Sequence, residues 1–279
     1  MASGGHDSVL RVWDVLSGKD LPQTPTGGGG ITCAAALWGY RVATGHNSTG
    51  EIRVWSLGGG GGAAGVLQGH MQWVISLAVV GGGTAQRLLA SGSADRSVRL
   101  WDVDAGTCTA VLSGHTDSVL CLADLGGGRL LSGTLDTSCG LRVWNTVTGA
   151  CLAVVPYAHG TGYEAGIRAA CALPGGAATL SIAGGTTVRQ WKWDNEGAGA
   201  ITQDGAALQL ERGHGAMSPL AAVLMPDGAQ LLLTGSRDGS PTVLCNGGAG
   251  GALQQQATLV GGHSGAITGL VVMRDGCVD

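Results

Sequence analysis

Short apolar segments that end in tryptophan recur along the chain, and apolar and polar residues alternate within each segment. The tryptophans follow one another at intervals of 42, 46, 43 and 47 residues, at Trp13, Trp55, Trp101, Trp144 and Trp191. The residue two positions before each of them is an arginine, in order Arg11, Arg53, Arg99, Arg142 and Arg189. Alternation with a period of two predicts a β-strand, and a repeat of this length is typical of a unit of four strands.

Two further signals precede the tryptophan segments. The nearer one is a run of small residues with a tight turn, as in ASGSADRS and LSGTLDTS, which predicts a strand and a hairpin. The farther one is a Gly-His pair followed by an apolar stretch, with His70, His115, His214 and His263 in such pairs and His159 in an Ala-His variant. A fourth, outer strand such as CTAVL or CLAVV should follow each tryptophan. Helical periodicity of useful length does not occur in the sequence, so we expect an all-β chain.

The Gly-His pairs, the Ser-Gly-Ser run and the Trp-Asp pair, at this period, resemble the WD-repeat (WD40) β-propeller family over essentially the whole chain. The resemblance implies a single propeller domain, residues 1–279, built from four-stranded antiparallel blades. In that family a His, a Ser or Thr, an Asp and the Trp of one unit form a buried hydrogen-bonded network. Such a network is physically reasonable, because an unpaired buried donor or acceptor costs about 1–3 kcal/mol.

Carried over to this chain, the resemblance implies complete networks in the third and fourth units. Their members are His70, Ser91, Asp95 and Trp101, and His115, Ser132, Asp136 and Trp144. The other units are degenerate. The fifth keeps His159, Ser181 and Trp191 but has Gly185 where Asp is expected. The sixth keeps His214, Thr234 and Asp238 but has Cys245 in the place of Trp, and the second, with TGGGGI, is expected to have no network His at all.

The two ends of the chain carry complementary parts of one unit. Ser3, Asp7 and Trp13 match Ser91, Asp95 and Trp101 without a gap, and the C-terminal half-unit 257–279 supplies His263. Joining the ends gives a His-to-Ser spacing of 19 residues, within the internal range of 17 to 22. We therefore expect six blade-equivalents, one of them shared by the N- and C-termini. The alternative is an incomplete fragment of a larger WD-repeat protein, such as part of a seven-bladed ring.

Composition narrows the function. The chain has 279 residues, 53 of them Gly, a net charge of -4 and 15 Lys and Arg spread thinly, so it offers no basic patch for nucleic acid. No apolar run reaches the length of a membrane helix, and no secretory signal opens the sequence. We expect an intracellular protein, cytoplasmic or nuclear, that binds neither membrane nor nucleic acid.

Two residue types are unusual in number or spacing. The eight Cys show no CxxC spacing, so free thiols are expected. The glycine runs 27–30 and 58–62 are interpreted as flexible linkers.

No set of residues predicts catalysis. No nucleophile, base and orienting group emerge together, and the histidines of the Gly-His pairs have a structural explanation, so we expect no enzyme, cofactor or metal. Binding should then be the function, at loops of one rim of the propeller. The candidate contacts are Trp73, Tyr163, Glu164 and Arg237. Trp73 could instead pack on a neighbouring blade, and the arginines of the tryptophan segments are expected to lay their stems between blades.

These observations predict a non-enzymatic scaffold that binds peptide or protein partners on the propeller rim and blade edges, as a monomer or as a subunit of a larger complex. The alternative is the substrate-receptor subunit of a ubiquitin ligase. Members of the family that dock on the damaged-DNA-binding adaptor commonly carry Arg two residues after the Trp-Asp pair. This chain has Leu16 and Asp104 at those positions, which disfavours the alternative.

Overall fold

The computed structural model describes most of the N-terminal half of the chain and shorter segments of the rest. The described residues are 2–4, 8–12, 24–27, 29–57, 62–81, 87–136, 140–156, 166–172, 179–184, 187–193, 201–203, 208–209, 220–224, 230–234, 242–246 and 253–258. The chain forms two compact units, one of Met1–Ser132 with Trp144–Cys151 and the other of Gly133–Val143 with Leu152–Asp279.

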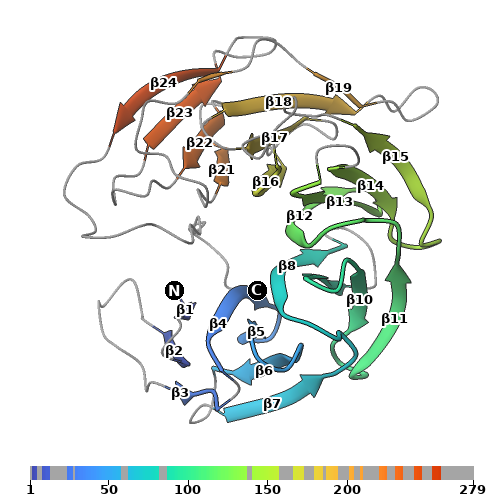
Figure 1. The fold of residues 1–279 in the computed structure, drawn as a ribbon. Coiled ribbons are helices and arrows are strands. Elements are labelled where there is room, and N and C mark those ends of the chain that lie inside the picture. The colour runs from blue at the N-terminus through green and yellow to red at the C-terminus, as the bar shows by residue number, and fades with distance from the viewer. Residues whose placement is uncertain are drawn as a thin grey trace. The chain divides into compact units, whose positions relative to one another are not determined.

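All the described elements are β-strands, and within each sheet neighbouring strands follow one another in chain order, except that β20 pairs with β18 (Figure 1). The first sheet contains β1 (Ala2–Gly4), β2 (Val9–Val12) and β3 (Thr24–Pro25). The second contains β4 (Ile31–Leu37), β5 (Arg41–His46), β6 (Ile52–Ser56) and β7 (Gly62–Leu67). The third contains β8 (Val74–Val80), β9 (Leu88–Ser93), β10 (Val98–Asp102) and β11 (Thr107–Leu112).

Three more sheets follow along the chain. The fourth contains β12 (Val119–Gly126), β13 (Arg129–Thr134), β14 (Leu141–Asn145) and β15 (Cys151–Val155). The fifth contains β16 (Ala169–Ala172), β17 (Thr179–Gly184), β18 (Thr187–Trp193), β19 (Ile201–Gln203) and β20 (Leu208–Gln209). The sixth contains β21 (Leu220–Leu224), β22 (Gln230–Thr234), β23 (Thr242–Asn246) and β24 (Leu253–Thr258).

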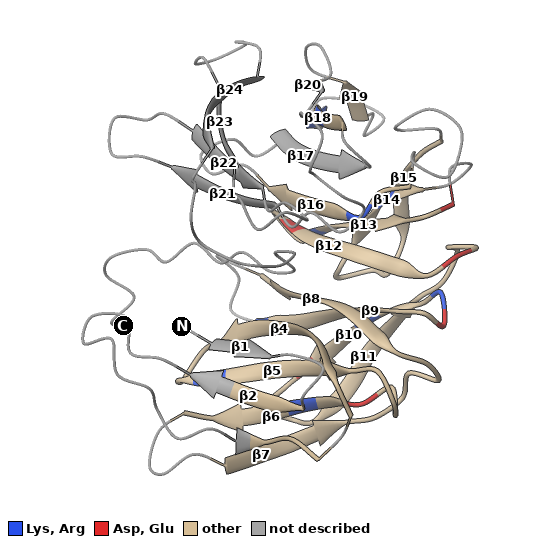
Figure 2. Ribbon diagram, turned by 60° about the vertical axis from the view of Figure 1, so that its left-hand side comes forward, with Lys and Arg blue, Asp and Glu red and all other residues tan. Residues whose placement is uncertain are grey.

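The all-β prediction is confirmed for the described residues, and the predicted tryptophan strands are β2, β6, β10, β14 and β18. Four of the six sheets have the expected four strands. The first has three strands within its described residues. The fifth has five, because β18 is long enough to pair with β19 at Trp191–Trp193 and with β20 at Thr187 and Val188. Charged residues are sparse along the described strands (Figure 2).

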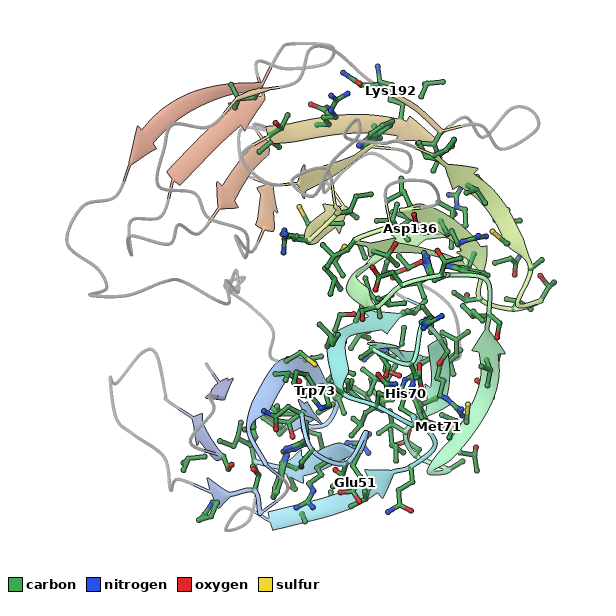
Figure 3. All side chains as sticks on the ribbon, viewed as in Figure 1. Glu51, His70, Met71, Trp73, Asp136 and Lys192 are labelled. Carbon is green, nitrogen blue, oxygen red and sulfur yellow. The ribbon has the colours of Figure 1, made fainter. Side chains whose placement is uncertain are left out.

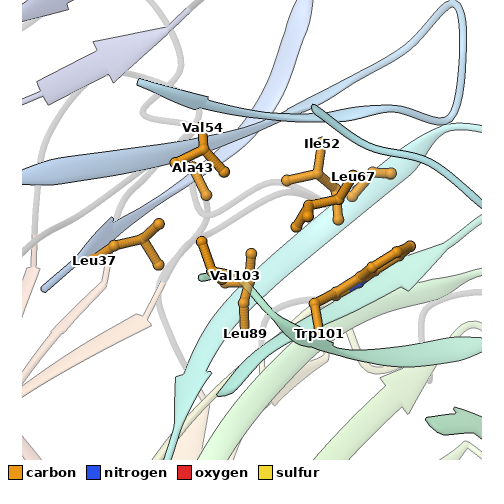
Figure 4. Close-up of a cluster of buried hydrophobic side chains, with 9 residues drawn as sticks. Leu37, Ala43, Ile52, Val54, Leu67, Leu89, Trp101 and Val103 are labelled. Atoms are coloured by element: carbon orange, nitrogen blue, oxygen red, sulfur yellow. The ribbon is translucent and has the colours of Figure 1, made fainter. Parts of the chain in front are cut away.

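Large apolar side chains of neighbouring sheets fill the core. Trp101 of β10 packs in one buried cluster with Leu37, Val54 and Leu67 of the second sheet (Figure 4). Trp144 of β14 packs in another with Leu100 of the third sheet. Trp101 and Trp144 therefore each pack against the sheet before their own, which gives a physical reason for a large flat side chain at this position of the repeat.

Gly45 and Gly92 occupy equivalent positions, and neither can carry a side chain without displacing a neighbour. A Cβ atom on Gly45 would lie 2.8 Å from Cγ1 of Val74, and one on Gly92 would lie 2.6 Å from Cγ1 of Val119. Val74 and Val119 begin the innermost strands of the next sheets. Gly45 follows Thr44 and Gly92 follows Ser91, so the glycine after the network hydroxyl allows adjacent sheets to approach closely in these two units.

The register between the second and third strands is shared by several sheets. A Ser or Thr pairs with the Arg of the tryptophan segment in the first three sheets, as Ser3 with Arg11, Thr44 with Arg53 and Ser91 with Arg99. In the sixth sheet Thr234 pairs with Thr242, so the tryptophan position two residues later belongs to Leu244. Leu244 lies 10 residues after Thr234, as Trp101 lies 10 residues after Ser91, whereas the sequence alignment assigns this position to Cys245.

A second observation supports this alignment. The pairing with the outer strand is irregular directly before Trp55 and Trp101, and in the sixth sheet the irregularity falls directly before Leu244. The fifth sheet departs from the register altogether. Ser181 pairs with Gln190, and Ile182 is the residue that pairs with Arg189. Since a slip of one residue exchanges the two faces of a strand, the predicted position of Ser181 as the network hydroxyl is not supported.

The part of the chain that the structure describes contains no helix of the length and hydropathy needed to cross a membrane.

Candidate functional site

His70 is the centre of a buried hydrogen-bonded network in the third sheet. Its Nδ1 atom lies 2.8 Å from Oδ2 of Asp95, and its Nε2 atom lies 2.7 Å from Oγ of Ser91. The indole Nε1 of Trp101 donates to the same Ser91 oxygen at 2.7 Å. Because the carboxylate can only accept, Nδ1 carries a proton, and the Ser91 hydroxyl donates to Nε2. The structure therefore brings together all four residues expected in the third unit.

Asp95 does more than accept from His70. Its Oδ2 atom also accepts from the backbone amide of Met71 at 3.0 Å, and its Oδ1 atom accepts from the amide and hydroxyl of Ser97 at 2.9 and 2.6 Å. Burial alone would raise the pKa of Asp95, but the hydrogen bonds from His70, Ser97 and Met71 outweigh it and hold that pKa well below its usual range. The carboxylate thus links the buried imidazole to two surface segments.

The fourth sheet repeats the inner part of this network. Nε2 of His115 lies 2.5 Å from Oγ of Ser132, and Nε1 of Trp144 donates to that oxygen at 2.7 Å. In both sheets the imidazole meets the indole edge to face, with ring centroids 6.1 Å apart for His70 and Trp101 and 5.9 Å apart for His115 and Trp144. Asp136 follows β13 and is half-buried.

The second sheet contains a network that sequence reasoning missed. Thr44 accepts from Nε1 of Trp55 at 2.8 Å, and its Oγ1 atom lies 2.9 Å from Nε2 of His46. Nδ1 of His46 donates to the carbonyl oxygen of Gly29 at 3.2 Å. The expectation that this unit lacks a network histidine is therefore wrong, since the imidazole comes from the second strand itself.

The same geometry corrects the interpretation of the glycine run 27–30. Gly29 supplies the acceptor for His46, and Gly30 accepts from the amide of Asn47 at 3.1 Å. Gly29 and Gly30 therefore take part in the hydrogen bonds of the second sheet and are not a linker.

Burial lowers the pKa of His46, which keeps the imidazole neutral in the folded chain.

The Ser91–His70–Asp95 arrangement has the order of a catalytic triad, but its hydroxyl is fully buried. A nucleophile must reach a substrate carbonyl, and Ser91 already accepts from Trp101, so the arrangement serves packing in this conformation. Within the described residues, no group of three or more His, Cys, Asp or Glu side chains could hold a metal ion.

The described cysteines and arginines have the following surroundings. Cys33, Cys108, Cys121, Cys151 and Cys171 form no disulfide, and burial raises the pKa of Cys33 and Cys171 to about 12, which keeps these two thiols protonated. Arg53 forms an ion pair with Glu51 at 3.0 Å, and Arg189 donates to Gln203 at 2.7 Å.

The segment that joins β7 to β8 presents two large apolar side chains to solvent. Met71 is 87% exposed and Trp73 is 55% exposed, so Trp73 is not packed away between sheets (Figure 3). The backbone of this segment is fixed to the turn between β9 and β10. The carbonyl of Trp73 accepts from Ala94 at 2.9 Å, and the carbonyl of Gln72 accepts from the hydroxyl of Ser93 at 3.2 Å.

With the bond from the Met71 amide to Asp95, three hydrogen bonds hold this segment. We call residues 71–73 together with the turn 94–97 the Trp73 surface. The turn between β5 and β6 lies beside it, because a Cβ atom on Gly50 would come within 2.5 Å of the His70 carbonyl oxygen. The Trp73 surface is therefore at the end of the sheets opposite the β4–β5 turn, where Tyr40 is 72% exposed.

Several predicted residues cannot be placed. Tyr163, Glu164 and Arg237 lie outside the described residues, as do His263, Asp7 and Trp13. Of the expected shared unit, the structure describes the backbone of Ser3 in β1. Trp191 is buried in β18, but its Nε1 atom has no hydrogen-bond partner in the described part of the chain, which agrees with the shifted register of the fifth sheet.

Comparisons with known proteins agree with this geometry. The model of the WD domain, G-beta repeat, matches residues 62–102 and 106–145, which contain the Trp73 surface and both His-Ser-Trp networks. Autophagy-related protein 16 from Arabidopsis thaliana is 29% identical over 153 residues, which are 55% of this chain and 29% of that protein. Protein tipD from Dictyostelium discoideum is 28% identical over 160 residues, 57% of this chain and 25% of that protein. The matches span less than a third of the length of either relative. The chain therefore carries WD40 repeats, at residues 62–102 and 106–145.

Proposed function

We propose that this chain is a non-enzymatic scaffold for protein interactions and that its Trp73 surface binds a peptide or protein partner. WD40 repeats imply an interaction role in general terms. The observation that carries the specific proposal is the pair of exposed side chains, Met71 and Trp73, on a segment whose backbone is held by three hydrogen bonds.

Rigid exposure of this kind favours binding for two physical reasons. A tryptophan in an interface contributes a large apolar contact area and often dominates the affinity. A segment that is already ordered loses little conformational entropy when a partner binds, so more of the contact energy appears as affinity. Solvent exposure of both side chains is unfavourable in the free protein, and a partner would relieve it.

The finer features of the scaffold rest on the sequence. We propose Tyr163, Glu164 and Arg237 as further contacts on the same rim of a propeller. We also propose that His263 joins Ser3, Asp7 and Trp13 in one blade, formed by the first sheet and the C-terminal end of the chain. The spacing of 19 residues supports this closure, and so does the pairing of Ser3 with Arg11, which matches that of Ser91 with Arg99.

The ligase alternative gains no support from the described residues. At the position where adaptor-binding members carry Arg, Asp104 forms an ion pair with Arg41 at 2.6 Å and accepts from Nε1 of Trp38 at 3.2 Å. The name of the Arabidopsis relative, autophagy-related protein 16, makes autophagy proteins a reasonable first set of partners to test.

The experiment that tests the proposal compares three forms of the chain as affinity baits in a quantitative co-purification: wild type, Trp73→Ala and Tyr40→Ala. Tyr40→Ala removes an exposed aromatic at the opposite end of the second sheet and serves as the matched control. We expect proteins held by the wild type and by Tyr40→Ala to be lost from Trp73→Ala, with a loss in affinity of about 2 kcal/mol or more and an unchanged melting temperature. Equal recovery of every protein by all three baits contradicts the proposal.

A further inference from the structure

Arg96 adds a positive charge to the Trp73 surface. It lies in the turn between β9 and β10, it is exposed, and none of the ion pairs among the described residues involves it. The neighbouring carboxylate of Asp95 is occupied by His70, Met71 and Ser97. By contrast, Arg41 and Arg53 are held by Asp104 and Glu51.

The backbone of Arg96 has a φ angle of 70°, in the left-handed region that glycine or asparagine adopts most readily. An arginine there is unfavourable for folding, and such outliers are common where a side chain serves binding. Arg96 is therefore a poor choice for the turn alone, which points to a role for its guanidinium.

The turn that carries Arg96 is bonded to the exposed segment. Ala94 donates to the carbonyl of Trp73, and the Met71 amide donates to Asp95, so the two residues before Arg96 both contact that segment. A partner that covers Met71 and Trp73 therefore lies near the turn that exposes the Arg96 side chain. Arginine pairs best with a carboxylate, which it can bind through two parallel hydrogen bonds.

We propose that the Trp73 surface recognises a peptide segment in which a large apolar side chain stands within a few residues of an Asp or Glu. The apolar side chain packs on Met71 and Trp73, and the carboxylate pairs with Arg96. This inference rests on the proposed function and adds the chemistry of the partner to it.

The test begins with a library of random short peptides displayed on phage and selected on the full chain. We expect the retained peptides to combine a large apolar residue with an Asp or Glu. A selected peptide is then synthesised with its Glu and, separately, with Gln in that position, and both forms are titrated against wild type. The Glu form should bind at least about tenfold more tightly, with a difference that shrinks as salt is raised.

Two charge-reversed variants complete the design. Arg96→Glu should lose the preference for the Glu form, and selection on it should enrich Lys or Arg instead. Arg87→Glu makes the same change at the opposite end of β9, at another exposed arginine, and should behave as wild type. Thermal unfolding of both variants checks that they are folded.

The outcomes separate the two proposals. Peptides that need Trp73 but bind equally well with Glu or Gln overturn the acidic-partner inference and leave the proposed function standing. Peptides that bind Trp73→Ala as well as they bind wild type overturn both proposals. A library from which wild type retains no peptide overturns the inference of a short linear partner.

Discussion

The backbone amide of Met71 donates at 3.0 Å to Oδ2 of Asp95, the same oxygen that lies 2.8 Å from Nδ1 of the buried His70. One carboxylate oxygen thus joins the interior of the third sheet to the first residue of the exposed segment. Since hydrogen bonds within a network strengthen one another, the order of the interior and that of the Trp73 surface should depend on each other.

The first prediction concerns Asp95. Asp95→Ala should lower the free energy of unfolding by about 1–3 kcal/mol, because it leaves His70 and the hydrogen-bond donors around it without their acceptor. Urea unfolding of wild type and variant measures the difference. Asp102→Ala is the matched control, since Asp102 accepts from the amides of Asp104 and Ala105 in an exposed turn, and its loss should cost less. An Asp95→Ala variant as stable as wild type contradicts the network.

The second prediction tests the network of the second sheet. Thr44→Val keeps the shape of the side chain but removes the oxygen that accepts from Trp55 and contacts His46. Both partners are buried, so the free energy of unfolding should fall by about 1–3 kcal/mol. Thr107→Val makes the same replacement at an exposed position of β11 and should leave the stability unchanged. Equal effects of the two substitutions argue against a network around Thr44.

The third prediction is a pH dependence. The pKa of His46 is lowered in the fold by burial, with Arg53 acting in the same direction and Gly29 and Glu51 opposing it. The unfolded chain therefore binds more protons than the folded chain once the pH falls below about 6.5, and the stability contributed by neutral His46 is lost in that range. The pKa of Asp95 is also lowered, so its contribution disappears only under more acidic conditions, below about pH 4.

His46→Gln isolates the effect of His46, because glutamine forms hydrogen bonds but does not titrate near neutral pH. Its free energy of unfolding, measured by urea unfolding, should be lower than that of wild type at pH 7.5 and should fall less between pH 7 and pH 5. Identical pH profiles for the two proteins contradict a neutral, buried His46.

The fourth prediction concerns close packing between sheets. Gly92→Ala places a Cβ atom 2.6 Å from Val119 and 2.5 Å from Oγ of Ser76, so it should destabilise the chain by about 1–3 kcal/mol. Gly65→Ala is the control, because a Cβ atom on Gly65 in β7 meets nothing within 4 Å. Gly65→Ala should be neutral or slightly stabilising. A Gly92→Ala variant that is as stable as Gly65→Ala contradicts close approach of the sheets at Gly92.

The strands and the His70 network could be predicted from the sequence because their signals are local. Period-two alternation defines a strand, and the four-residue spacing of Ser91 and Asp95 recurs in Ser3 and Asp7 and in Ser132 and Asp136. The distance from the network hydroxyl to the tryptophan is less uniform, at 10 residues in the third unit, 11 in the second and 12 in the fourth. Because the turn length varies, the sequence alone does not define the register between the second and third strands. The strand pairing is what aligns Ile182 with Ser91 and Leu244 with Trp101.

The His46 network could not be predicted from the Gly-His pattern, because that pattern places the histidine before the first strand of each sheet and His46 lies in the second. A signal did exist, since Thr44 and His46 are two residues apart and must share one face of a strand. The exposure of Trp73 had no such signal, because a tryptophan in that segment could equally pack on a neighbouring sheet. The hydrogen bonds from Ala94, Ser93 and Asp95, distant in sequence, fix the segment that carries Trp73.

The most direct test of the link between interior and surface is amide hydrogen exchange at Met71. In wild type this amide should exchange slowly although it lies in an exposed segment, because it donates to Asp95. In Asp95→Ala it should exchange at nearly the rate of an unstructured peptide, while the amides of β10 stay protected. A Met71 amide that is unprotected in wild type, or one whose protection survives Asp95→Ala, contradicts the account.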